Sequence, residues 1–333
     1  MDSDYEKALA LLISGEIIGM PTETVYGLAG RVDFPSAIAK IFKIKNRPFF
    51  DPLIVHVSSV AMAKGLTTTW TSMIDVLAHE FWPGPLTLVL PKSSFVSDLI
   101  TAGLGTVGIR MPKHELALKL IRDLGAPLAA PSANKFGRSS PTTAKHVQSE
   151  FKADSVFVLD GGPCEVGLES TVLLVDGKDL SILRAGKVSK SEIEKVLTAA
   201  KIPFSFSEME NHKASPGHMK HHYMPAIPLL LIESPQISQL PLTDLKKIVS
   251  QKMNELPAEI QGVKIIKPQS VDNFVELSLS ADPTLSARQF YSSLRDCAET
   301  KADVIIFYKK EFHSGENWEA LFDRMRKAAS LVL

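Results

Sequence analysis

The chain has 333 residues, 45% of them hydrophobic and 22% charged, a composition that suits two globular domains and argues against disorder. Lys plus Arg and Asp plus Glu each total 37, so the net charge is zero, which argues against an extended nucleic-acid-binding surface but not against a local basic patch. The two cysteines, Cys164 and Cys297, lie far apart and offer neither a disulfide framework nor a metal-binding spacing, so we expect buried thiols in a reducing compartment.

The N-terminus is acidic, and no apolar run reaches the ~18 residues that a membrane span needs. We therefore expect no signal peptide, no contact with a membrane and a cytoplasmic location.

Short apolar runs alternate with helical patterns through the first 200 residues. A first helix is predicted by the spacing of Ala8, Leu12 and Ile13, and a later one begins at a capping box formed by Ser189 and Glu192. The helix with the capping box covers residues 190–200, and the remaining predicted helices begin at Pro35 or cover residues 71–81, 113–124 and 142–150. The predicted strands cover residues 17–20, 53–57, 86–90, 106–110, 156–159 and 171–175. This alternation indicates an α/β or α+β domain with a mixed sheet.

Prolines and histidines interrupt the pattern between the two halves of the chain. Pro216, Gly217 and Pro225 break any helix or strand there, and His212, His218, His221 and His222 crowd the same stretch. Beyond it, strands are predicted over 229–232, 263–266 and 304–307, with helices over 243–255, 284–299 and 316–330. The three segments are predicted to be a first domain over residues 1–205, a linker over 206–228, and a smaller domain with a parallel sheet over 229–333.

Two nucleotide-binding patterns can be set aside. Gly103, Gly105 and Gly108 have the G-x-G-x-x-G spacing, but they lead into a predicted strand rather than from a strand into a helix. A Walker A sequence is also absent from the 333 residues, so an ATP site would need a different phosphate cradle.

Basic residues cluster where predicted elements end. Lys45 and Arg47 close a helix just before Pro48, and a pair of cations on a fixed turn suits a polyphosphate, although cations are also favoured there by the helix dipole. Arg110 ends an apolar strand, where it needs either an anionic ligand or a salt bridge.

Hydroxyl and amide side chains follow other strand ends. Thr22 and Thr24 follow the first strand, and one or the other is expected to cap a following helix. Similar polar groups occur beside small residues at Ser132, Asn134, Ser170 and Arg184. Each could be an ordinary turn, but their common layout favours one ligand site.

The whole set resembles the YrdC-like family, the threonylcarbamoyl-AMP synthases, in its longer, two-domain form. The matching motifs occur in order as PTETVYGL, KNRP with DPLIVH, WPGPLT, GIRMP, APSAN, SPT, GLEST and LRAG, followed by SPG and HYMP in the linker. Ala185 and Met224 depart from the family pattern, where Pro and Ala are usual, and neither change removes a polar group. The resemblance is specific over residues 14–200 and in the linker.

The resemblance implies a twisted mixed sheet with a concave cleft, followed by a linker and a smaller Rossmann-like C-terminal domain. It implies a nucleotidyltransferase that converts L-threonine, bicarbonate and ATP, with Mg²⁺ on the triphosphate and no protein metal site, into threonylcarbamoyl-AMP and pyrophosphate. The product would pass to a partner tRNA threonylcarbamoyl transferase, and a direct contact with tRNA is left open.

The resemblance also implies roles for single residues. Phosphates would be held by Lys45, Arg47 and Arg184, while Thr106, Ser132 and Asn134 would contact nucleotide or substrate. The threonine site would be lined by Thr22, His56, Arg110 and Ser170, although a lone histidine in an apolar strand is as often a core residue. Tyr223 from the linker would close over the cleft as a lid.

Two other functions compete with this interpretation. Seven Lys or Arg residues face two acidic residues between Arg110 and Lys145, so an RNA-binding module without ATP turnover is an alternative. A metal hydrolase built on the four linker histidines is the second, but no cysteine or nearby acidic residue completes a zinc site.

Overall fold

A computed structural model describes residues 2–207, 221–260, 263–268 and 270–333, and these form two compact units. The first unit consists of Met1–Lys135 and Pro141–His218, and the second of Phe136–Ser140 and Met219–Leu333. The boundaries predicted at 205 and 229 fall on either side of residues 208–220, which lie outside the described residues, and they stay a prediction.

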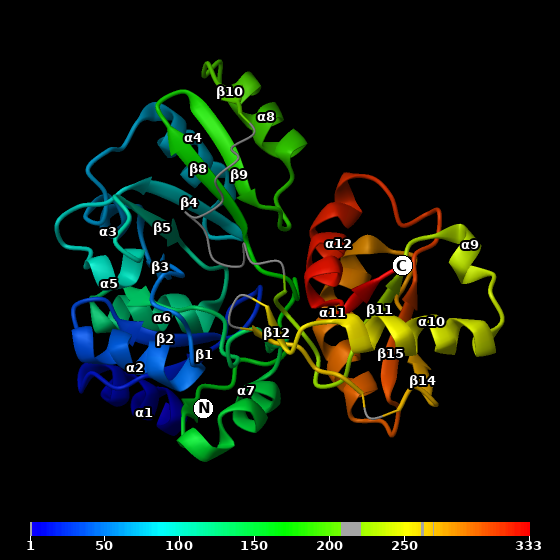
Figure 1. Ribbon diagram of the computed structural model, residues 1–333. Helices are drawn as coiled ribbons and strands as arrows, with labels where there is room; N and C mark the ends of the chain where they lie inside the picture. Colours follow the sequence, from blue (N-terminus) through cyan, green and yellow to red (C-terminus); the bar gives the residue numbers. More distant parts are fainter. Residues whose placement is uncertain (1, 208–220, 261–262, 269) are drawn as a thin grey trace. The chain divides into compact units, whose positions relative to one another are not determined.

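The first unit is built on a twisted mixed sheet (Figure 1). Among the described residues its ten strands run in the order β10-β9-β8-β4-β5-β3-β6-β2-β1-β7. Their bounds are β1 Ile18–Met20, β2 Gly27–Arg31, β3 Ile54–His56, β4 Leu86–Pro91, β5 Thr106–Arg110, β6 Leu128–Ala129, β7 Phe157–Val158, β8 Thr171–Asp176, β9 Asp179–Arg184 and β10 Ser205–Phe206. The sheet combines parallel pairs, such as β3 with β5, and antiparallel pairs, such as β4 with β5, as the predicted mixed sheet requires.

The helices of the first unit pack against the sheet in two separate hydrophobic clusters. Their bounds are α1 Asp2–Ile13, α2 Pro35–Lys45, α3 Val60–Lys64, α4 Ser72–Phe81, α5 Asp98–Thr101, α6 Glu115–Leu124, α7 Ala144–Glu150 and α8 Lys190–Ala199, with a short 3₁₀ helix, η1, at Lys152–Asp154. Apolar residues of α2, α4 and α8 join the main core with those of the strands, whereas α1 and α6 pack against β1, β2 and β6 in a second cluster. The predicted capping box of α8 is present, formed by Ser189 and Glu192.

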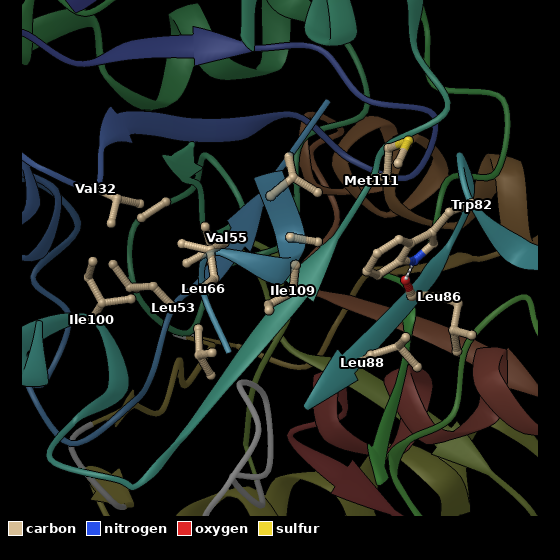
Figure 2. Close-up of a cluster of buried hydrophobic side chains, with 14 of the residues drawn as sticks. Val32, Leu53, Val55, Leu66, Trp82, Leu86, Leu88, Ile100, Ile109 and Met111 are labelled. Atoms are coloured by element: carbon tan, nitrogen blue, oxygen red, sulfur yellow. Dashed lines mark hydrogen bonds between the residues drawn. The ribbon is translucent and has the colours of Figure 1, made fainter. Parts of the chain in front are cut away.

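The main core lies on one face of the central strands. Alternation along β4 and β5 sends Leu86, Leu88, Val107 and Ile109 into it (Figure 2). The indole of Trp82 closes one end of the cluster and donates a hydrogen bond of 2.7 Å to the Leu86 carbonyl, so the ring is buried without leaving its N–H unsatisfied. The core therefore fixes which residues of each strand must point to the opposite face.

The second unit is a three-layer, Rossmann-like domain. Its strands β11 Leu229–Ile232, β14 Phe274–Glu276, β15 Val304–Tyr308 and β16 Leu331–Val332 form a parallel sheet in the order β14-β15-β11-β16. Its helices are α9 Pro235–Ser238, α10 Leu242–Glu255, α11 Pro283–Ala298 and α12 Glu316–Ala328 (Figure 1). Leu245 and Val249 of α10 pack on one face of the sheet, and α11 and α12 contact each other and the sheet.

One predicted strand of the second unit is placed wrongly by the sequence pattern. Residues 263–266 were expected in the parallel sheet, but Val263–Lys264 forms β13, which pairs antiparallel with β12, Glu259–Ile260. The parallel partner of β15 is instead the three-residue β14. Val263 packs with Met224 and Ile265 in a separate small cluster. Val263 and Ile265 are therefore buried without joining the parallel sheet.

No helix in the described part of the chain is long and apolar enough to cross a membrane.

Candidate active site

The face of the first unit's sheet that lies opposite the main core carries the polar strand residues. Since Val107 and Ile109 point into the core, Thr106, Gly108 and Arg110 of β5 point the other way. His56 of β3 pairs with Arg110 in the sheet, and an apolar cluster on this side comes from strand residues alone. The cluster consists of Ile54, Val89, Val172 and Leu183, with Leu174 packed against it.

A small hollow opens on this face. It holds about 10 Å³, room for about one water molecule, and is lined by Thr106, Gly108 and Thr87 together with apolar residues of the neighbouring strands. A Cβ added at Gly108 would lie 3.3 Å from the Thr87 methyl group and 3.5 Å from Ile54, so a larger residue there would fill part of the hollow. Thr106 is half-buried at its edge.

Arg110 finds its counter-charge within the chain. Its Nη2 lies 2.6 Å from a carboxylate oxygen of Glu23, and both side chains are 4% exposed or less. The same guanidinium donates hydrogen bonds to the Gly84 carbonyl at 3.1 Å and to the hydroxyl of Thr24 at 2.9 Å. Of the two partners left open by the sequence, the structure contains the salt bridge.

The turn that carries Glu23 is organised by hydroxyl groups. Thr22 Oγ1 donates to the Val25 carbonyl at 2.6 Å and shares a hydrogen bond of 2.9 Å with the hydroxyl of Thr24. The expectation that Thr22 or Thr24 caps a helix is wrong, because the next element is strand β2. The hydroxyls close a tight turn instead, and Thr24 links that turn to Arg110.

Lys45 and Arg47 are buried at the end of α2. Lys45 Nζ donates to the carbonyl of Ser132 at 2.5 Å and to that of Asn134. Burial, and then the positive charge of Arg47, hold the pKa of Lys45 well below its usual value. Arg47 forms an ion pair of 2.8 Å with Asp51 and donates to the Pro52 carbonyl, so it fastens its own loop. The two cations are thus close enough to influence each other and share a neighbourhood with Ser132 and Asn134.

Arg184 and Ser170 form a third group at the ends of β8 and β9. Arg184 Nε donates to the Ser170 carbonyl at 3.1 Å, and its Nη2 lies 3.2 Å from the Ser170 hydroxyl. That hydroxyl also shares a hydrogen bond of 2.8 Å with Thr87 of β4. A Cβ on Gly186 would lie 2.2 Å from the Thr171 nitrogen, so only glycine lets this chain segment approach the back of Ser170.

Two further titratable groups beside Arg110 are held neutral. Burial, and then the charge of Arg110, lower the pKa of His56 to about 3. Burial, and then the charge of Glu23, raise the pKa of the Cys164 thiol to about 12. His56 therefore has the features of a neutral core histidine, while Cys164, expected only as a buried small residue, also adjoins the ion pair.

The residues predicted from the sequence divide between the two units. The first unit contains all of them except Tyr223, and each of its four predicted cations is at most 7% exposed, so none stands on an outer surface. Those cations are Lys45, Arg47, Arg110 and Arg184. Tyr223 belongs to the second unit, where its ring contacts His222 and Tyr291, and its role as a lid stays a prediction.

Sequence reasoning assigned no role at the site to Glu23, Thr87, Cys164 or Gly186. Glu23 could have been found, because it is the one carboxylate within residues 21–28. Thr87 carries no such signal, since its contact with Ser170 depends on the pairing of β4 with β8.

Metal ligands are not grouped in the described part of the chain. Among those residues, no set of three or more His, Cys, Asp or Glu side chains is arranged to hold a metal ion. Of the four linker histidines, His212 and His218 lie outside the described residues, so the metal-hydrolase alternative is untested.

Comparison with known proteins gives matches along the whole chain. The family profile described as "Telomere recombination", which covers Sua5, YciO and YrdC proteins, matches residues 10–186, and the profile described as "Threonylcarbamoyl-AMP synthase, C-terminal domain" matches residues 188–330. The threonylcarbamoyl-AMP synthase of Bacillus subtilis is 37% identical over 98% of this chain and 93% of its own length. The threonylcarbamoyl-AMP synthase of Pyrococcus abyssi is 36% identical over 97% of this chain and 93% of its own length. A crystal structure of P. abyssi Sua5 complexed with L-threonine matches with a TM-score of 0.80 at 32% identity, covering 100% of this chain and 96% of that one.

Proposed function

The chain belongs to the Sua5, YciO and YrdC family in its two-domain form, and on this premise we propose that it synthesises threonylcarbamoyl-AMP. The substrates are L-threonine, bicarbonate and ATP, the products are threonylcarbamoyl-AMP, pyrophosphate and water, and the enzyme acts as a nucleotidyltransferase. The observation that carries the proposal is the full-length similarity to synthases with the same two domains, including one bound to L-threonine.

The chemistry requires two steps. The amine of threonine combines with carbon dioxide derived from bicarbonate to give a carbamate, and the carbamate oxygen then attacks the α-phosphorus of ATP and displaces pyrophosphate. Both steps are accelerated mainly by holding the reactants in fixed positions and by stabilising the negative charge on the phosphates. A set of buried cations and hydroxyls provides this without a covalent intermediate on the protein.

We assign the phosphates to Lys45, Arg47 and Arg184. Each is buried, and each now donates hydrogen bonds to backbone carbonyl oxygens, which phosphate oxygens can replace as stronger, charged acceptors. The low pKa of Lys45 fits this role, because a bound triphosphate favours its protonated form and offsets the burial. Thr106, Ser132 and Asn134 are assigned to the nucleotide.

We assign L-threonine to Thr22, His56, Arg110 and Ser170, with Arg110 on its carboxylate. Arg110 adjoins the Thr22 turn through Thr24 and pairs with His56 across the sheet, so three of the four lie in one neighbourhood. Tyr223 is assigned the lid that excludes water from the product, a mixed anhydride that water hydrolyses.

Mg²⁺ is proposed to accompany the triphosphate, where it would neutralise charge on the phosphate oxygens. A hard cation of this kind usually keeps several waters and takes phosphate oxygens in preference to an all-protein cage. We further propose that the reaction occurs in the cytoplasm and that a partner tRNA threonylcarbamoyl transferase uses the product.

The proposal is tested by pyrophosphate release from the purified full-length chain, with threonine, bicarbonate and ATP omitted in turn. Release should require all three, and serine should replace threonine only partly, because one methyl group gives modest discrimination. Release without threonine would contradict the proposed reaction, and salt-dependent tRNA binding with no ATP turnover would favour the RNA-binding alternative.

A further inference from the structure

The ion pair between Glu23 and Arg110 leaves most of the carboxylate unused. Both side chains are almost fully buried and the two atoms lie 2.6 Å apart. Within the described part of the chain, Oε2 of Glu23 meets Arg110 alone and Oε1 has no hydrogen-bond partner, although a carboxylate can accept about four hydrogen bonds. Buried polar groups are normally satisfied, so these free positions need an explanation.

The backbone holds Glu23 in place independently of its side chain. Its carbonyl accepts a hydrogen bond of 2.7 Å from Val166, and the Thr22 and Thr24 hydroxyls fix the turn on either side. Arg110 is likewise fastened by Gly84 and Thr24. Two opposite charges are therefore presented side by side from a rigid turn and a strand end.

The immediate surroundings add no net charge to this pair. His56, which faces Arg110, is neutral because burial lowers its pKa to about 3, and Cys164, which faces Glu23, is neutral because burial raises its pKa to about 12. The four groups together carry a net charge of zero. A ligand with a single charge would leave that charge uncompensated in a buried site, and such a charge is costly.

We propose that Glu23 and Arg110 together form the receptor for the zwitterionic headgroup of an amino acid, with Arg110 binding the carboxylate and Glu23 binding the ammonium group. A zwitterion brings both charges at once, keeps the site neutral and supplies N–H donors to the free positions of Glu23. This inference rests on the proposed function and adds to it a specificity-determining residue, Glu23. It predicts that the site selects amino acids over hydroxy acids that have the same carboxylate and hydroxyl groups.

The test compares two ligands by isothermal titration calorimetry on the full chain: L-threonine, and (2S,3R)-2,3-dihydroxybutanoate, which has a hydroxyl in place of the amine. Native protein should bind L-threonine at least about tenfold more tightly, since the hydroxy acid leaves Glu23 unpaired. Glu23→Gln should weaken L-threonine binding by about tenfold or more and leave binding of the hydroxy acid unchanged or improved.

Two variants serve as controls. Asp33→Asn removes the carboxylate of another 2.6 Å arginine pair, Arg31 with Asp33, which is 18–35% exposed, and it should change neither affinity. Glu23→Asp keeps the charge and should keep the preference for L-threonine. If Glu23→Gln fails to fold, equal affinity of native protein for the two ligands would still overturn the proposal.

Equal affinity of native protein for the two ligands would overturn the proposal. So would an equal loss of both in Glu23→Gln, which would mean that Glu23 only positions Arg110. Failure of the proposed function looks different, because native protein would then release no threonine-dependent pyrophosphate whatever its ligand preference.

Discussion

Replacing Arg110 with alanine should damage both the stability and the activity of the first unit, for separable reasons. The guanidinium is the counter-charge of Glu23 at 2.6 Å, with exposures of 4% and 3%, so its removal leaves a buried carboxylate without compensation. Breaking a buried ion pair in this way costs about 3–5 kcal/mol in the free energy of unfolding. The double variant Glu23→Gln, Arg110→Met leaves no buried charge and should recover most of that loss, because well-packed neutral replacements of buried pairs are often close to neutral.

Urea unfolding followed by tryptophan fluorescence measures this cycle. Trp70 and Trp82 lie in the first unit and Trp318 in the second, so a Trp318→Phe background restricts the signal to the unit that contains the ion pair. Both variants should lack threonine-dependent pyrophosphate release, since neither has the cation for the carboxylate. A loss below about 1 kcal/mol in Arg110→Ala, or a double variant as unstable as the single one, would show that the pair is not buried as described.

Three other predictions concern His56, the two cysteines and Gly186. The free energy of unfolding should fall as the pH drops from about 6.5 towards 3, because His56 takes up a proton in the unfolded chain but not in the folded protein, where its pKa is about 3. The urea midpoint of His56→Gln should depend less on pH over this range. The same pH profile in the variant and the native protein would contradict this prediction. Iodoacetamide should modify Cys297 in the native protein, whereas Cys164 should react only after unfolding, because its thiol is buried and its pKa is raised. Peptide mass spectrometry measures the labelling of each cysteine, and labelling of Cys164 in the native protein would refute this prediction. Gly186→Ala should lower the free energy of unfolding by about 1–3 kcal/mol and abolish most of the activity, because the added methyl group displaces the Ser170 backbone. A native melting temperature together with native pyrophosphate release would rule this out.

Much of the fold was predictable because apolar periodicity is strong in its long elements. Residues 106–110 were predicted as a strand and form β5 with the same bounds, and the capping box at Ser189 and Glu192 starts α8 as expected. The short elements escaped prediction. Strand β14 has three residues and β16 has two, too few to display an alternation, so the stronger apolar run at 263–266 was assigned to the sheet instead.

The candidate site was predictable in its residue types but not in its pairings. Strand-end cations such as Arg110 stand out in a sequence because an unpaired charge in an apolar run is costly. Its partner Glu23 is 87 positions away and is chosen by the packing of a turn against a strand, which no local pattern encodes. The helix expected after Thr22 failed for a local reason, because hydroxyl side chains close turns as readily as they cap helices.

The most direct test of the proposed reaction is to identify its product. Native protein incubated with L-threonine, ATP, Mg²⁺ and ¹³C-labelled bicarbonate should yield threonylcarbamoyl-AMP, detected by mass spectrometry with the label in its carbamoyl group. Arg110→Ala should yield none. Labelled product from Arg110→Ala at the native rate, or pyrophosphate released by native protein without any labelled adenylate, would contradict an active site built around this residue.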